Sequence, residues 1–174
     1  AIALFPGGFG THDEGFEIMT LVQTGKSDPK PIVCLQAPGC DYWNHWNSFI
    51  TDQLLKRRLI NPEDLSLFTI VDNVEDAVTE IRTFYRRYHS LRFVGRQLVI
   101  RLKTPLTDPQ VEDLQRQFKD MLTEGTFEQR PSLPEEMDEP GLKDLARLTF
   151  SFNRRNAGRL RQLIDHLNQL PVPG

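Results

Sequence analysis

A short apolar run, residues 1–5, leads directly into a glycine-rich stretch, Pro6-Gly7-Gly8-Phe9-Gly10-Thr11-His12-Asp13-Glu14. This order predicts a β-strand, a glycine loop and then a helix that opens at Thr11. Glycine reaches backbone conformations closed to other residues, so the three glycines can turn successive N–H groups toward an anion. The helix would add the positive end of its dipole. The stretch therefore predicts a phosphate-binding loop, although the same glycines also suit a plain strand-to-helix turn.

Glu14 can be interpreted in two ways. It stands three residues after Thr11, which is the spacing of a capping box at a helix start. Alternatively, Glu14 continues an apolar stripe that we expect along the helix, through Ile18 and Val22. A second carboxylate, Glu17, borders the same face, and two carboxylates beside an anion-binding loop are a common arrangement for acid–base catalysis. The residues alone leave capping and catalysis both open.

Residues 6–14 resemble the PGGxGTxxE signature of the LONELY GUY (LOG) phosphoribohydrolases, proteins often labelled possible lysine decarboxylases. Further similarity lies in four segments, residues 17–26, 30–33, 39–43 and 71–73. The resemblance covers roughly residues 1–85. It implies an enzyme, a hydrolase that cleaves the N-glycosidic bond of nucleoside 5′-monophosphates and releases free base and ribose 5-phosphate.

The resemblance also implies roles for single residues. Glu14 would be catalytic, because an anionic carboxylate near the anomeric carbon stabilises the positive charge that develops on the sugar. Glu17 would bind ribose hydroxyls or tune Glu14. The phosphate would be held by Gly7, Gly8, Gly10 and Thr11. We expect no cofactor and no metal ion, because two carboxylates without a third ligand make a poor metal site.

In the LOG family an arginine that partners the signature glutamate comes from a segment upstream of the glycine loop. We expect this arginine and the first half of the nucleotide-binding domain to lie outside the sequence, and the chain to be inactive alone. A rival interpretation is a regulatory protein that binds a nucleotide without cleaving it. A third is an oligomerisation unit whose glycine loop stays empty.

Composition restricts the function classes. The chain has 174 residues, 39% of them hydrophobic, which suffices for one moderate core or two small ones. A net charge of −3 argues against a dedicated nucleic-acid-binding protein. No apolar run approaches the roughly 20 residues that span a bilayer, so we expect no membrane insertion. Cys34 and Cys40 lack the spacing of a zinc site, and reduced thiols without a signal peptide favour a cytoplasmic location.

Continuous apolar runs alternate with helical patterns in residues 1–89, which predicts parallel strands buried on both faces. We therefore expect an α/β domain, the C-terminal half of a doubly wound, Rossmann-like parallel sheet. The expected strands are 1–5, 31–36 and 66–71, and the expected helices are 11–24, 44–57 and 74–88. Asp72-Asn73 is expected to cap the last of these helices.

Residues 90–174 have a different character and predict a small α+β module outside the resemblance. A strand is expected within 92–103, a helix from Thr107, a loop rich in proline and glutamate over 130–141, an alternating strand over 148–152 and a final helix. A short strand at 125–128 would complete the order β-α-β-β-α.

Side chains outside the signature carry weaker signals. His12 is expected to face solvent, with substrate contact as the alternative. Four aromatic residues are expected to form core or subunit contacts, with base stacking as the alternative: Tyr42, Trp43, Trp46 and Phe49. We expect a homodimer or higher homo-oligomer, which the LOG resemblance also implies. Four arginines around the last helix, Arg154, Arg155, Arg159 and Arg161, are expected on a solvated face, with an anionic effector or partner subunit as alternatives.

Overall fold

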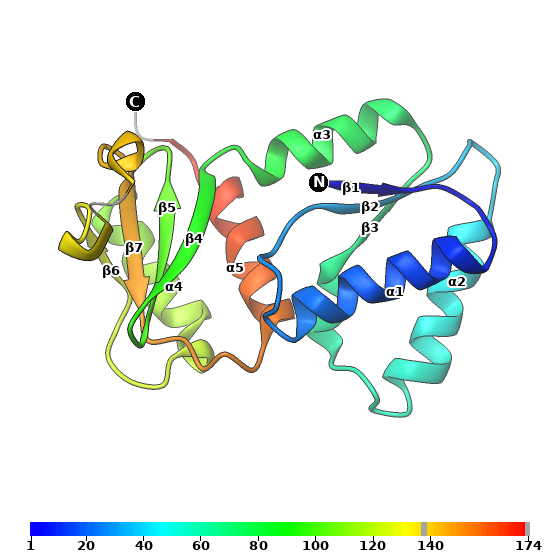
Figure 1. Ribbon diagram of the computed structural model, residues 1–174, viewed down its shortest axis with the longest axis horizontal. Coiled ribbons are helices and arrows are strands. Elements are labelled where there is room, and N and C mark those ends of the chain that lie inside the picture. The colour runs from blue at the N-terminus through cyan, green and yellow to red at the C-terminus, as the bar shows by residue number, and fades with distance from the viewer. Residues whose placement is uncertain (137–138, 173–174) are drawn as a thin grey trace. The chain divides into compact units, whose positions relative to one another are not determined.

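The computed structural model describes residues 1–136 and 139–172, and the chain divides into two units (Figure 1). Unit 1 comprises residues 1–84 and 155–162. Unit 2 comprises residues 85–154 and the chain from Leu163 onward. No helix in the described part of the chain is both long and apolar enough to cross a bilayer.

Unit 1 contains a parallel sheet with helices, as the sequence predicts. Its strands are β1 (Ile2–Leu4), β2 (Ile32–Leu35) and β3 (Thr69–Val71). Its helices are α1 (Phe9–Gln23), α2 (Tyr42–Phe49), which continues as a π-helical segment (Ile50–Leu55), a 3₁₀ helix (Pro62–Leu67) and α3 (Val74–Phe84). The strand order is β1-β2-β3, with Ile2 opposite Ile32 and Val33 opposite Thr69. The α/β, Rossmann-like fold class is therefore confirmed.

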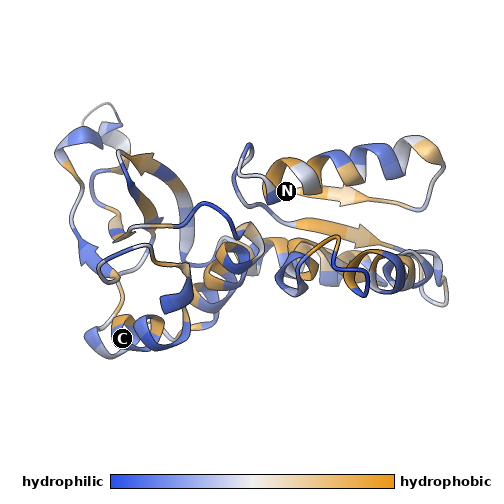
Figure 2. Ribbon diagram, turned by 90° about the horizontal axis from the view of Figure 1, so that it is seen from below, coloured by the Kyte–Doolittle hydropathy of each residue, from blue (hydrophilic) through white to orange (hydrophobic). Residues whose placement is uncertain are grey.

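Strand β2 explains why the sheet forms. All four of its residues are buried. Ile32 and Cys34 pack into a cluster with Trp43 of α2, whereas Val33 and Leu35 pack against α3. A parallel strand covered on both faces needs such a continuous apolar run. Figure 2 shows the strands of unit 1 as hydrophobic, while the helices beside them mix hydrophobic and hydrophilic residues.

Several element boundaries in unit 1 differ from the expected ones. The expected helix 44–57 starts earlier, at Tyr42, and its second half is π-helical. The expected strand 66–71 starts only at Thr69, because Pro62 and a capping box begin a short helix just before it.

Unit 2 is an antiparallel sheet with helices. Its strands are β4 (Tyr88–Val94), β5 (Gln97–Leu102), β6 (Glu128–Arg130) and β7 (Ala146–Phe150), in the order β4-β5-β7-β6. Its helical elements are α4 (Asp108–Gln117) and short 3₁₀ helices at Lys119–Met121, Pro134–Glu136 and Pro140–Leu142. The last helix, α5 (Ala157–Gln169), is divided between the units: its residues up to Gln162 belong to unit 1 and those from Leu163 onward to unit 2. The expected α+β character is confirmed. The structure adds one strand, β4, before the first strand that the sequence predicts for this region. The helix expected over 74–88 ends at Phe84, and Tyr88 already belongs to β4.

A buried charge network lies on one face of this second sheet. Arg101 of β5 and Arg147 of β7 are cross-strand neighbours, and both are buried. Their Nε atoms donate to the two carboxylate oxygens of Glu136, at 2.8 Å and 2.9 Å. The side chain of Glu136 has an exposed fraction of 0%. The loop that the sequence predicts over 130–141 thus inserts a carboxylate between two strand arginines.

Candidate functional site

The glycine loop connects β1 to α1, and α1 begins two residues earlier than expected. Gly8 is the N-cap, and its carbonyl accepts the N–H groups of Thr11 at 3.2 Å and His12 at 3.4 Å. Among the described residues, the N–H groups of Gly8, Phe9 and Gly10 have no backbone acceptor. Unsatisfied N–H groups at the positive end of a helix can bind an anion.

The three glycines of the loop differ in their surroundings. A Cβ atom on Gly7 would overlap the hydroxyl oxygen of Thr11, so that hydroxyl lies directly beside the loop. A Cβ on Gly8 or Gly10 would have no neighbour within 4 Å. The loop is therefore packed at Gly7 and open at the other two glycines, where a ligand could reach the backbone.

Tyr42 contacts the glycine loop, and His12 contacts Tyr42. The Tyr42 hydroxyl lies 2.6 Å from the Gly7 carbonyl oxygen and 2.8 Å from Nε2 of His12. The rings of His12 and Tyr42 are stacked, with centroids 5.7 Å apart. The expectation that His12 faces solvent is therefore wrong, because its ring is half-buried against aromatic neighbours.

Glu14 fits neither of the two structural expectations. The helix has no side-chain cap, so the capping box with Thr11 does not form. The inward stripe of α1 runs through Ile18 and Val22 as expected, but Gly15 rather than Glu14 continues it, and Glu14 is exposed. Gly15 allows this helix to approach β1, because a Cβ there would lie 3.2 Å from Leu4.

Glu17 is exposed as well. Within the described residues, neither Glu14 nor Glu17 has a hydrogen-bond or ion-pair partner. Both carboxylates therefore project from α1, one and two turns after the glycine loop, where nothing in the described chain fixes their position.

A groove of about 550 Å³ lies at the carboxyl ends of the three parallel strands. Ligands of open α/β sheets bind at this edge. The wall that follows β1 is Phe5 and Pro6 of the glycine loop. The other walls follow β2 and β3, and are formed by Leu35, Gln36, Ala37, Pro38 and Cys40, and by Asp72, Asn73, Val74 and Glu75.

Gln36 organises this groove, although the sequence analysis did not single it out. Its Nε2 donates to Asp72 at 2.9 Å, and its Oε1 accepts the Trp43 N–H at 2.8 Å. Gln36 is buried, whereas Asp72 is exposed and can accept hydrogen bonds from ligand hydroxyls. The available signal was a polar residue directly after each of the two strands β2 and β3. Asn73 caps α3 as expected, by accepting the Asp76 N–H at 2.7 Å.

The aromatic residues divide between core and surface. Trp43 and Trp46 are buried, as the core interpretation predicts. Phe49 is 49% exposed, and two phenylalanines next to the glycine loop are more exposed still, Phe5 at 58% and Phe9 at 96%.

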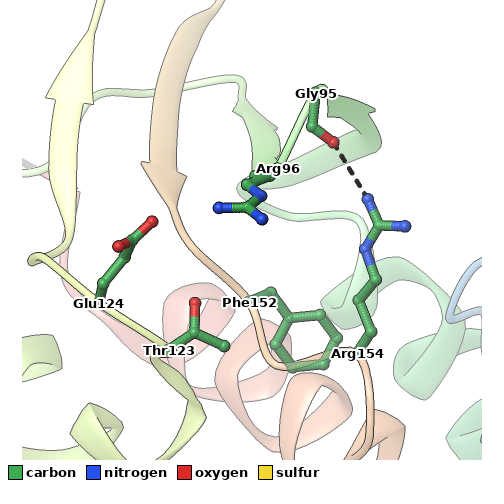
Figure 3. Close-up of a pocket in the computed structure, with 6 residues that line it drawn as sticks. All are labelled: Gly95, Arg96, Thr123, Glu124, Phe152 and Arg154. Carbon is green, nitrogen blue, oxygen red and sulfur yellow. Dashed lines mark hydrogen bonds between the residues drawn. The ribbon is translucent and has the colours of Figure 1, made fainter.

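A second hollow, of about 500 Å³, lies within unit 2 (Figure 3). Its lining residues are Gly95, Arg96, Thr123, Glu124, Phe152 and Arg154. Arg154 donates to the Gly95 carbonyl at 3.2 Å, and its guanidinium lies over the Phe93 ring. In unit 1, Arg161 is buried and forms an ion pair with Glu80 at 2.7 Å, so the solvated face expected for the four arginines is wrong at this position.

The comparisons with known proteins concern the first half of the chain. No curated protein matches the sequence. Residues 1–81 match the family model described as "Possible lysine decarboxylase". Those residues span β1, the glycine loop, the parallel sheet and most of α3. Residues 1–81 are thus similar to the possible lysine decarboxylase family, which includes the LOG proteins, and the match does not extend to the C-terminal region.

Proposed function

We propose that the protein is a LOG-type phosphoribohydrolase, which binds a nucleoside 5′-monophosphate and hydrolyses its N-glycosidic bond. The observation that carries the proposal is the set of unsatisfied N–H groups at Gly8, Phe9 and Gly10, in the segment that matches the family. In this proposal these groups and the Thr11 hydroxyl hold the phosphate. The sugar and base extend toward the groove at the strand ends, where Asp72 accepts hydrogen bonds from hydroxyl groups.

The proposed reaction adds water across one bond. The bond between the anomeric carbon and the base nitrogen breaks, and the nitrogen gains a proton. The anomeric carbon gains the hydroxyl of water, which leaves ribose 5-phosphate. Glu14 stabilises the positive charge on the sugar and accepts a proton from water, and Glu17 binds ribose hydroxyls or tunes Glu14.

A homodimer would suit the exposed rings beside this site. Phe5, Phe9 and Phe16 surround the glycine loop and the first turns of α1, and all three are exposed. Full burial of one such ring stabilises by about 1.5 to 3 kcal/mol. Contact with a second copy would cover these rings and hold the exposed Glu14. The homodimer and the cytoplasmic location both stay predictions.

The alternative is a nucleotide-binding protein that does not cleave its ligand. The exposure of Glu14, which has no partner in the described chain, favours this alternative, because catalysis requires a fixed carboxylate. In that case the site would report nucleotide occupancy rather than turn nucleotides over.

An assay of base release by the full-length protein distinguishes the hydrolase from the nucleotide-binding protein that does not cleave its ligand. A panel of nucleoside monophosphates is incubated with wild type, with Glu14→Gln and with a control, Glu112→Gln, which alters an exposed carboxylate on α4. We expect release by wild type and by the control, and loss of release with retained nucleotide binding in Glu14→Gln. Binding without release by any protein supports the alternative, and full turnover by Glu14→Gln contradicts the role of Glu14.

A further inference from the structure

The Tyr42 hydroxyl contacts two groups but carries only one hydrogen. The Gly7 carbonyl oxygen, at 2.6 Å, can only accept a hydrogen bond. The Tyr42 hydrogen therefore points to Gly7, and the second contact, at 2.8 Å, must be donated by Nε2–H of His12. The result is a directed chain of donors that runs from His12 through Tyr42 to the Gly7 carbonyl.

This chain fixes the orientation of one peptide group. The Gly7 carbonyl and the Gly8 N–H belong to the same planar, trans peptide, so they point in opposite directions. A peptide between two glycines is also the one most free to rotate. If it turned over, a carbonyl oxygen would replace an N–H group on the side that faces a ligand, and it would repel an anion.

Ring packing holds the side chains of Tyr42 and His12 in place. The Tyr42 ring packs edge-on against Trp43, with centroids 4.9 Å apart, and stacks on His12. Trp43 is anchored in turn by its hydrogen bond to Gln36. The Tyr42 hydroxyl is therefore a fixed point to which the Gly7 carbonyl attaches.

We propose that Tyr42 and His12 are positioning residues that keep the Gly7–Gly8 peptide in the orientation that binds an anion. The identity of this anion as a nucleotide phosphate rests on the proposed function. Neither residue touches the reacting atoms. Their effect is on ligand affinity, because a correctly oriented loop binds phosphate equally in the substrate and in the transition state.

The first test needs no variant and no activity. Nitrogen-resolved NMR of the histidine rings in the full-length protein should show His12 as the Nε2–H tautomer. A neutral Nδ1–H tautomer would overturn the proposal, because Nε2 could then not donate to Tyr42.

The second test compares Tyr42→Phe with wild type for binding of inorganic phosphate and of a nucleoside monophosphate. One net hydrogen bond corresponds to roughly a three- to tenfold loss of affinity. We expect that loss for both ligands, with kcat nearly unchanged and KM raised wherever turnover is measurable. His12→Gln, which keeps a side-chain N–H donor, should bind phosphate better than His12→Leu. A matched control, Tyr85→Phe, removes a hydroxyl in unit 2 and should bind as wild type.

The outcomes separate this inference from the proposed function. Phosphate affinity that depends on Tyr42, in a protein that releases no base, supports the positioning role and contradicts the hydrolase. Base release with the same affinity and KM in wild type and Tyr42→Phe supports the hydrolase and overturns the positioning role, even if the variant melts at a lower temperature. Absence of phosphate and nucleotide binding in wild type overturns both.

Discussion

Replacement of the buried carboxylate of Glu136 by an amide, in Glu136→Gln, should strongly destabilise the sheet of unit 2. In wild type one oxygen accepts from Arg101, and the other accepts from Arg147 and from the Leu133 N–H. Glutamine has the same shape, so the change leaves no cavity. Its amide has one acceptor and one donor end, and the donor end must face a guanidinium that also only donates.

The structure decides which way the amide turns and how large the effect is. Arg101 has a second carboxylate partner, Glu139, whereas the other hydrogen bond of Arg147 goes to the Leu145 carbonyl. The amide nitrogen should therefore face Arg101 and leave the oxygen to Arg147 and Leu133. One buried charge is still lost from the network, and breaking a buried ion pair costs about 3 to 5 kcal/mol. A typical domain has a free energy of unfolding of roughly 5 to 15 kcal/mol, so the loss is a large fraction.

Hydrogen exchange of the amides in β5 and β7 measures this directly. Tryptophan fluorescence does not, because both tryptophans, Trp43 and Trp46, lie in unit 1. The control is Glu128→Gln, which alters an ion pair with Arg130 that is nearly half exposed and should change the free energy of unfolding by less than about 1 kcal/mol. A change for Glu136→Gln as small as that of the control would refute the reasoning.

The same network gives a pH dependence. Burial alone would raise the pKa of Glu136, but hydrogen bonds from Arg147, the Leu133 N–H and Arg101 outweigh it and hold this pKa below its usual value of 4.5. A carboxyl whose pKa is lowered by folding stabilises the folded state above its unfolded pKa, and this contribution is lost as the pH falls through the folded pKa. Unit 2 of wild type should therefore lose stability below about pH 4.5, and Glu136→Gln should lose less over the same range.

Two further predictions concern unit 1. Gly7→Ala should weaken nucleotide binding strongly, because the new methyl group displaces the Thr11 hydroxyl, whereas the open surroundings of Gly10 predict that Gly10→Ala keeps wild-type thermal stability. Calorimetric titration and melting curves of both variants check this, and equal nucleotide affinity in Gly7→Ala and wild type would contradict it. Light scattering of the full-length protein should give the mass of a dimer, as expected from Phe9, which is 96% exposed; a monomer at micromolar concentration would contradict this.

The sequence predicts those parts of the fold that follow from local periodicity. The continuous apolar run of β2 predicts a strand covered on both faces, and Asn73 predicts the start of α3; both are found. The glycine loop is also found after β1, but its details depend on atoms distant in the sequence. The contact between Tyr42 and His12 joins residues 30 positions apart, and no local pattern predicts it.

The failures have identifiable physical causes. One interpretation placed Glu14 on the inward face because it lies four residues before Ile18, but in α1 the buried residue is Gly15, three residues before Ile18, and Glu14 is exposed. Strand β4 was missed because the helical pattern of α3 continues into Tyr88. The contact of Glu136 with the sheet of unit 2 could not be predicted, because it depends on Arg101, 35 residues away.

The parallel arrangement around β2 also affects how the chain folds during synthesis. Ile2 pairs with Ile32 and Val33 pairs with Thr69, so each pairing closes a crossover of at least thirty residues. Such non-local pairing is slow, because the entropy of a long loop is lost before any contact compensates for it. At the ribosome the pairing of β1 with β2 must therefore wait until β2 has been made, and the pairing of β2 with β3 must wait for β3. During that interval the apolar run of β2 is open to other chains, and the folding yield depends on how quickly translation delivers residues 69–71.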